Sequence, residues 1–266
     1  MRNPERGQQL RDMVQKEKLP VSIIKMDVDS DDSVTAAVAT ATAQGGFIQA
    51  LVNNAGLEAN GSIEEMPLKT FRSVMETNYF GPLRCIKACL PEMRKRQSGC
   101  IVNLSSVAGR FAASPMGPYT TSKFALEAIS EVLAQEVKAF NVRVAIVEPG
   151  VIDTPMARRA AQPPADSPYP QHRRFAAMFV ASLGNPVPPS LVAETIREII
   201  ESETTQLRHP LGPSAAGLLQ WRASMSDEDF VSWGALQDSD WYDRVHKEFG
   251  LDARPRGEQS WRRPSQ

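Results

Sequence analysis

The chain has 266 residues, enough to bury a sizeable core, and its net charge of -1 gives no overall attraction to nucleic acid or to an anionic membrane. Its apolar runs are too short to span a bilayer, and its polar, charged start has no apolar core of a secretory signal. Three cysteines and three scattered histidines form no pattern typical of a metal site. We therefore expect a cytoplasmic protein with no membrane span, no bound metal and no nucleic-acid partner.

Short apolar runs alternate with amphipathic stretches in the first part of the chain. The runs rich in Val and Ile are predicted to be buried strands: Val21–Val28, Phe47–Ala55, Cys100–Ser106 and Val142–Pro149. Helices are predicted between them: Ser33–Gln44, Leu68–Gln97 with an internal Pro82, and Ser122–Phe140. This alternation favours an α/β fold with a parallel sheet covered on both faces, in which ligands gather at the carboxyl ends of the strands.

The sequence changes character after Gly150. Residues 151–189 are predicted to form a long irregular connection that acts as a substrate lid. Ser190 and Ser226 are each predicted to cap a helix, and Gln206–Gly212 is predicted to add a strand. We expect a main domain over 1–213, a helical appendage with an aromatic core on the substrate side over 214–250, and a disordered tail over 251–266.

A tyrosine and a lysine stand four residues apart near the start of one predicted helix, in the stretch PYTTSK. Positions i and i+4 share a helix face, so the side chains of Tyr119 and Lys123 should nearly touch. An ammonium beside a phenol favours the phenolate and would lower the pKa of Tyr119, as a general acid/base requires. A lone pair of this kind also occurs by chance, with the tyrosine packed and the lysine solvated.

Four further motifs accompany that pair in a fixed order. They are NNAG (Asn53–Gly56), TNYFG with Asn78, NLSS with Ser106, and EPGVIDTPM after the last predicted strand. With them the chain resembles the short-chain dehydrogenase/reductase family over roughly Arg2–Pro213, and is most similar to the branch containing 17β-hydroxysteroid and retinol dehydrogenases. The resemblance implies a Rossmann-like, doubly wound parallel sheet and a homo-oligomer.

The resemblance also implies catalytic roles. Tyr119 would be the general acid/base, and Lys123 would lower its pKa and hold the nicotinamide ribose. Ser106 would stabilise the substrate oxygen, and Asn78 would help hold a water that connects Lys123 to solvent. Ser105 is the alternative serine, and the spacing to the tyrosine favours Ser106.

A nicotinamide cofactor is implied in the same way. The cofactor-binding positions would be Arg2, Asp27, Val28, Asn54, Ala55, Gly56, Tyr119, Lys123, Pro149, Gly150, Val151 and Thr154. A basic residue where Arg2 stands can pair with a 2′-phosphate, so NADP(H) is expected rather than NAD. A solvated arginine at a strand end is the alternative.

The largest departure from the family is a missing turn. No GxxxGxG or GxGxxG spacing occurs in the sequence, although a dinucleotide fold binds the pyrophosphate with such a turn at a helix N-terminus. The start, MRNPERG, resembles the family just past its second strand. We therefore expect an N-terminally truncated fold without the first strand, the phosphate turn and the second strand. We also expect this chain to be inactive or nearly so.

The expected function is that of an oxidoreductase. It would transfer a hydride between NADP(H) and the hydroxyl or ketone of a lipophilic, steroid- or retinoid-like small molecule. Apolar side chains on the predicted lid suit such a substrate: Met156, Phe175, Met178, Phe179 and Leu183. The alternative is a non-catalytic relative that uses the scaffold for binding or assembly.

Overall fold

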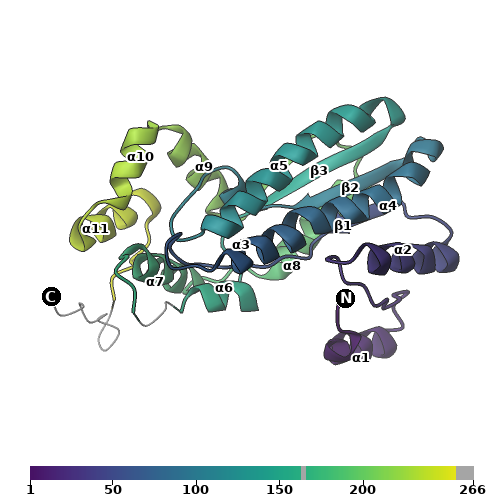
Figure 1. Cartoon of the computed structure of the whole chain (residues 1–266), viewed down its shortest axis with the longest axis horizontal. Coiled ribbons are helices and arrows are strands. Elements are labelled where there is room, and N and C mark those ends of the chain that lie inside the picture. The colour runs from purple at the N-terminus through teal and green to yellow at the C-terminus, as the bar shows by residue number, and fades with distance from the viewer. Residues whose placement is uncertain (163–165, 256–266) are drawn as a thin grey trace.

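The centre of the molecule is a parallel sheet of four strands. The computed structural model describes residues 1–162 and 166–255, so the predicted tail from residue 256 on lies outside the described residues. The strands, in sheet order, are β1 (Ala50–Asn53), β2 (Gly99–Leu104), β3 (Val142–Pro149) and β4 (Arg208–Leu211). All neighbours are parallel, and helices lie on both faces (Figure 1). The predicted Rossmann-like α/β fold is confirmed.

Helices connect and surround these strands. The α-helices are α1 (Gln8–Glu17), α2 (Asp31–Gly45), α3 (Leu68–Met75), α4 (Gly81–Arg96), α5 (Gly117–Val137), α6 (Pro155–Ala160), α7 (Gln171–Leu183), α8 (Pro189–Glu201), α9 (Ala215–Ala223), α10 (Asp227–Gly234) and α11 (Asp238–Phe249). In Figure 1, α9–α11 gather at one end of the molecule and α1 and α2 at the other. The predicted cap at Ser226 is confirmed, because its hydroxyl accepts a hydrogen bond from the Asp229 N–H at 3.0 Å.

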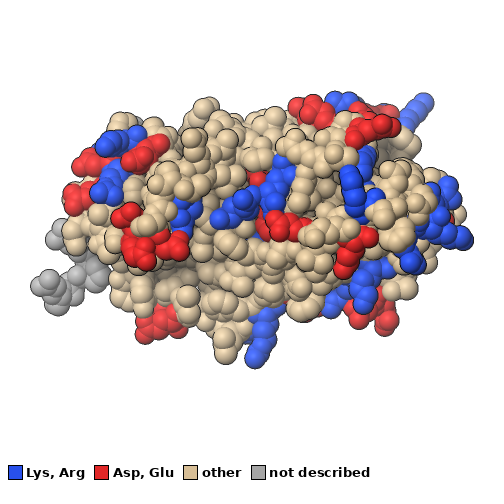
Figure 2. Space-filling model, turned by 90° about the horizontal axis from the view of Figure 1, so that it is seen from above, with Lys and Arg blue, Asp and Glu red and all other residues tan. Residues whose placement is uncertain are grey.

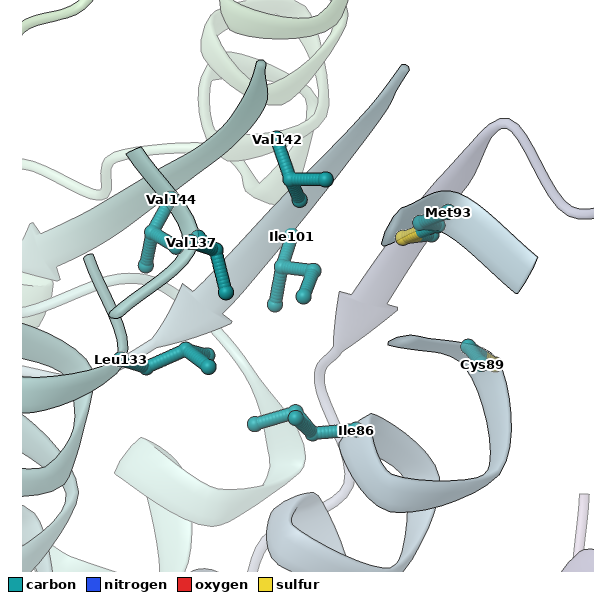
Figure 3. Close-up of a cluster of buried hydrophobic side chains, with 8 residues drawn as sticks. All are labelled: Ile86, Cys89, Met93, Ile101, Leu133, Val137, Val142 and Val144. Atoms are coloured by element: carbon teal, nitrogen blue, oxygen red, sulfur yellow. The ribbon is translucent and has the colours of Figure 1, made fainter. Parts of the chain in front are cut away.

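The main core lies between the sheet and the helix pair α4 and α5. Ile101 of β2 is fully buried there among aliphatic and sulfur-containing side chains from both helices (Figure 3). On the opposite face α8 packs its apolar stripe against β2 and β3, with Ile199 buried. Both faces of the sheet are thus closed, which explains why its strands are continuous apolar runs.

One predicted element differs near the N-terminus. Val21–Val28 is not a strand but has no regular structure up to a turn at Val28, because β1 pairs only with β2 among the described residues. Its backbone makes two hydrogen bonds with Met1: the Met1 ammonium donates to Ile24 O at 2.9 Å, and Met26 N–H donates to Met1 O at 3.1 Å. A strand requires a longer ladder than this.

Other predictions also need correction. The single helix predicted over Leu68–Gln97 is interrupted by a π-helical segment, Glu76–Phe80, directly before Pro82, which has no N–H to continue the ladder. The connection over 151–189 is not irregular, since it contains α6 and α7. Ser190 lies inside α8, whose cap position is Pro188.

Charges on the surface are mixed in sign. Figure 2 shows Lys and Arg side chains interspersed with Asp and Glu on the face it presents, with no large single-sign patch there. In the described part of the chain, no helix is both long and apolar enough to cross a membrane. Within the same ranges, no group of three or more His, Cys, Asp or Glu side chains is arranged to hold a metal ion.

Candidate active site

An apolar cavity of about 840 Å³ lies at the carboxyl ends of β2 and β3. Its floor is the strand ends and the start of α5, and its walls come from α6, α7, α8 and the appendage helices α9–α11. Open parallel sheets bind their ligands at this edge. The cavity is therefore the candidate active site, and its size suits a bulky small molecule.

Most of the predicted site residues line this cavity. They are Asn54, Gly56, Ser106, Tyr119, Lys123, Pro149, Gly150, Val151 and Thr154. Those that do not line it are Arg2, Asp27, Val28, Ala55 and Asn78. The first group comes from four separate stretches of chain, so the fold brings the motifs together as the sequence predicted.

Tyr119 stands in the first turn of α5, half-buried, and lines the cavity. Burial raises the pKa of Tyr119 to about 12, the Ser106 hydroxyl opposes this by hydrogen bonding, and the nearby charge of Glu58 adds to it. From the sequence we expected the pKa of Tyr119 to be lowered, and for the chain without a bound cofactor that expectation is wrong. The phenol is held protonated at neutral pH, the form that donates a proton to a carbonyl oxygen.

Lys123 is buried one turn further along α5. Its ammonium donates to the backbone carbonyl of Leu104, at the end of β2, at 2.7 Å, and lies 5.6 Å from the centre of the Tyr119 ring. Burial lowers the pKa of Lys123 to about 8, while the charge of Glu127 opposes the shift. The reading of Lys123 as a solvated lysine is wrong.

Ser106 and Ser105 follow β2 and both line the cavity. The Ser106 hydroxyl accepts from Ala108 N–H at 3.2 Å and donates to Pro149 O at 3.4 Å, beside Tyr119. Ser105 lies against Glu127, whose pKa is raised by burial and lowered in part by the Ser105 hydroxyl. The alternation of the strand thus gives the two serines different neighbours, and Ser106 is the one beside the phenol.

Asn78 lies in the π-helical segment and is almost fully buried. Its side chain accepts from Leu57 N–H at 2.7 Å and donates to Leu57 O at 2.8 Å and to the Ser122 hydroxyl at 2.9 Å. These bonds fix the loop after β1 against α5. π-helical turns are frequent at functional sites, and this one puts the amide against Ser122, the residue that precedes Lys123.

Arg2 and Asp27 lie together away from the cavity. The Arg2 guanidinium pairs with Asp27 at 3.0 Å and with Asp29 at 2.7 Å, and about half of its side chain is exposed. Asp29 also accepts from the Thr77 hydroxyl at 2.8 Å. Arg2 is therefore held by two carboxylates, and a 2′-phosphate would have to compete with them.

Phe111 and four rings of the appendage form an aromatic wall of the cavity, where from the sequence we expected only an aromatic core of the appendage. Phe111, Trp221 and Phe230 meet edge to face, and Trp221 also meets Trp233 and Phe249 at 5.0 Å between ring centres. All five rings line the cavity, together with four of the predicted lid residues: Met156, Phe175, Met178 and Phe179. Leu183, the fifth, does not line it. No motif in the sequence signals such a wall, because it forms from separate helices.

The residues present fit one end of a nicotinamide cofactor. The Lys123 ammonium lines the cavity and uses one of its three N–H donors on Leu104 O. The other two can donate to ribose hydroxyls. Gly150 and Thr154 line the same side; a Cβ at Gly150 would stand 2.6 Å from the Ser214 hydroxyl oxygen, so only glycine fits there without a shift. The pyrophosphate end has no glycine-rich turn in this sequence.

Comparison with known proteins gives consistent results. A family model described as "short chain dehydrogenase" matches residues 1–165. The chain is similar to the uncharacterized oxidoreductase YusZ of Bacillus subtilis, with 32% identity over 84% of this chain and 82% of that protein. It is also similar to retinol dehydrogenase 8 of Bos taurus, with 37% identity over 56% of this chain and 47% of that protein. A solved short-chain dehydrogenase from Streptomyces avermitilis superposes with a TM-score of 0.72 and 31% identity, covering 88% of this chain and 84% of that one.

Proposed function

Because the chain belongs to the short-chain dehydrogenase/reductase family, an oxidoreductase family that uses NAD(P), we propose that it reduces or oxidises a lipophilic ketone or alcohol with NADP(H). The observation that carries the proposal is the apolar cavity of about 840 Å³ onto which Tyr119, Ser106 and Lys123 open. Steroid- and retinoid-like molecules are the substrates whose size and polarity suit this cavity.

The proposed roles follow from the positions of the side chains. Tyr119, protonated at neutral pH, donates its proton to the carbonyl oxygen during reduction and takes it back during oxidation. The Ser106 hydroxyl, beside it, donates a hydrogen bond to the developing oxyanion. Lys123 holds the ribose hydroxyls, and its positive charge favours the phenolate that Tyr119 becomes after giving up its proton. Asn78 fixes the loop that borders both residues. NADP(H), when bound, supplies or accepts the hydride.

The preference for NADP(H) over NAD is part of the proposal and depends on Arg2. A guanidinium already placed between Asp27 and Asp29 can turn toward a 2′-phosphate, since about half of its side chain is exposed. Self-association is also proposed. It is supported by family membership and by Phe124 and Val132, which are exposed on α5.

Removing the Tyr119 hydroxyl tests the central role. In Tyr119→Phe the ring stays and the proton is lost. In a version of the chain extended upstream to supply a glycine-rich phosphate turn, turnover of a bulky ketone at saturating NADPH is expected to fall by roughly 100- to 10,000-fold. Tyr242→Phe is the matched control, because Tyr242 is a buried tyrosine in the α11 core that does not line the cavity. Retention of more than about a tenth of kcat in Tyr119→Phe would refute the assignment.

A further inference from the structure

A second, smaller pocket adjoins the apolar cavity. It has a volume of about 240 Å³, and the two spaces share Glu58 and Phe175 as lining residues. Unlike the main cavity it is lined by polar side chains, among them Asn60, Arg159 and His172. Glu58 follows the NNAG motif by two residues and stands between the two spaces, with its charge close enough to act on Tyr119.

Several polar atoms of this side pocket have no hydrogen-bond partner. His172 is only 6% exposed, and neither of its ring nitrogens makes a hydrogen bond within the described residues. Its Nε2 lies 3.6 Å from a carboxylate oxygen of Glu65, beyond hydrogen-bond distance. Asn60 donates to Glu58 at 3.0 Å, but its own side-chain oxygen is buried without a donor.

Buried polar groups in proteins are almost always paired, so these atoms indicate a missing polar partner. The space is large enough for one, because a single water needs only about 30 Å³ of liquid volume. A group that enters from the main cavity past Glu58 would meet Asn60 and His172 together. The pocket is therefore built to be filled by something polar.

The charges around the pocket select the kind of group. Glu58 and Arg159 have opposite signs, and the charge of Arg159 lowers the pKa of Glu58 against the larger raising effect of burial. Burial lowers the pKa of His172, so its ring is neutral at pH 7 and offers one N–H and one lone pair. A carboxylate would be placed against Glu58 and the Asn60 oxygen, which are both hydrogen-bond acceptors. An ammonium has no lone pair, so it could not accept the N–H of His172. A hydroxyl both donates and accepts.

We propose that this side pocket binds a hydroxyl group of the substrate. The substrate would then be a lipophilic ketone or alcohol that carries a second hydroxyl on a short branch, directed past Glu58 toward Asn60 and His172. The inference rests on the proposed function, because it assumes that the apolar body of the substrate fills the main cavity.

Binding of matched ketones tests the proposal without hydride transfer. The probes are 2-decalone and a set of its hydroxylated analogues, titrated into residues 1–266 by calorimetry with no cofactor. Two hydrogen bonds to neutral groups are together worth roughly a tenfold gain in affinity. At least one analogue, whose hydroxyl reaches both Asn60 and His172, is therefore expected to bind about ten times more tightly than 2-decalone. Equal or weaker binding of every analogue, with 2-decalone bound, overturns this inference alone. Failure of every decalone to bind contradicts the proposed apolar substrate as well.

Two variants locate the effect. Asn60→Leu and His172→Phe keep side-chain shape and remove the polar atoms, and both residues line only the side pocket. In each, the preference for the hydroxylated ketone is expected to fall below about threefold while 2-decalone binds as before. Asn185→Leu, at an exposed position between α7 and α8, is the control and should keep the preference. A preference that survives in both side-pocket variants refutes the assignment.

Discussion

The buried ammonium of Lys123 gives a pH-dependent contribution to stability that can be measured without substrate or cofactor. Burial lowers its pKa from 10.5 to about 8 in the folded chain. Between these values the unfolded chain binds more protons than the folded chain, so the free energy of unfolding rises with pH in this window. Each pKa unit corresponds to about 1.4 kcal/mol.

Lys123→Met removes this titration and keeps most of the side chain. From pH 7 to pH 10 the wild type should gain roughly 2–3 kcal/mol of unfolding free energy relative to Lys123→Met, because most of the pKa window lies in that range. Other titrating groups, such as the buried cysteines with raised pKa values, contribute equally to both proteins and cancel in the difference.

Urea unfolding at several pH values measures the difference directly. Lys87→Met is the matched control, since Lys87 is exposed on α4, and its difference from the wild type should stay flat across the same range. A flat difference for Lys123→Met would show that the ammonium is not buried as the structure has it. A difference that falls with pH would refute the sign of the argument.

Two further predictions concern the cofactor. In a chain extended upstream to supply a glycine-rich turn, Arg2→Asp should reverse the ratio of kcat/KM for NADPH and NADH. Arg2→Gln is the uncharged control, because it adds no third carboxylate beside Asp27 and Asp29. An unchanged ratio in Arg2→Asp would reject the phosphate role. The sequence has no glycine-rich turn, and each charge-assisted hydrogen bond that such a turn would make is worth about 1.5–3 kcal/mol. Residues 1–266 should therefore bind NADPH several orders of magnitude more weakly than a chain that has the turn. Calorimetric titration measures this affinity, and micromolar binding would contradict it.

The sequence by itself determined the sheet and most of the candidate site. Apolar runs such as Val142–Pro149 can be buried on both faces only in a covered parallel sheet, so β1, β2 and β3 and the helices between them were predictable. The motifs that end those strands meet at one edge because parallel strands share a direction. Tyr119 and Lys123 were identified by their i, i+4 spacing and Ser106 by its spacing to the tyrosine, both through the family resemblance.

Only the tertiary structure decided the environment of those residues. The pKa of Tyr119 depends on how completely the surrounding chain encloses its hydroxyl, and the i, i+4 spacing to Lys123 carries no information on that. A strand also requires a neighbour, so Val21–Val28, apolar enough to be one, forms no ladder. The polar side pocket was invisible for the same reason: Glu58 and His172 are 114 positions apart, and no local pattern relates residues that only packing brings together.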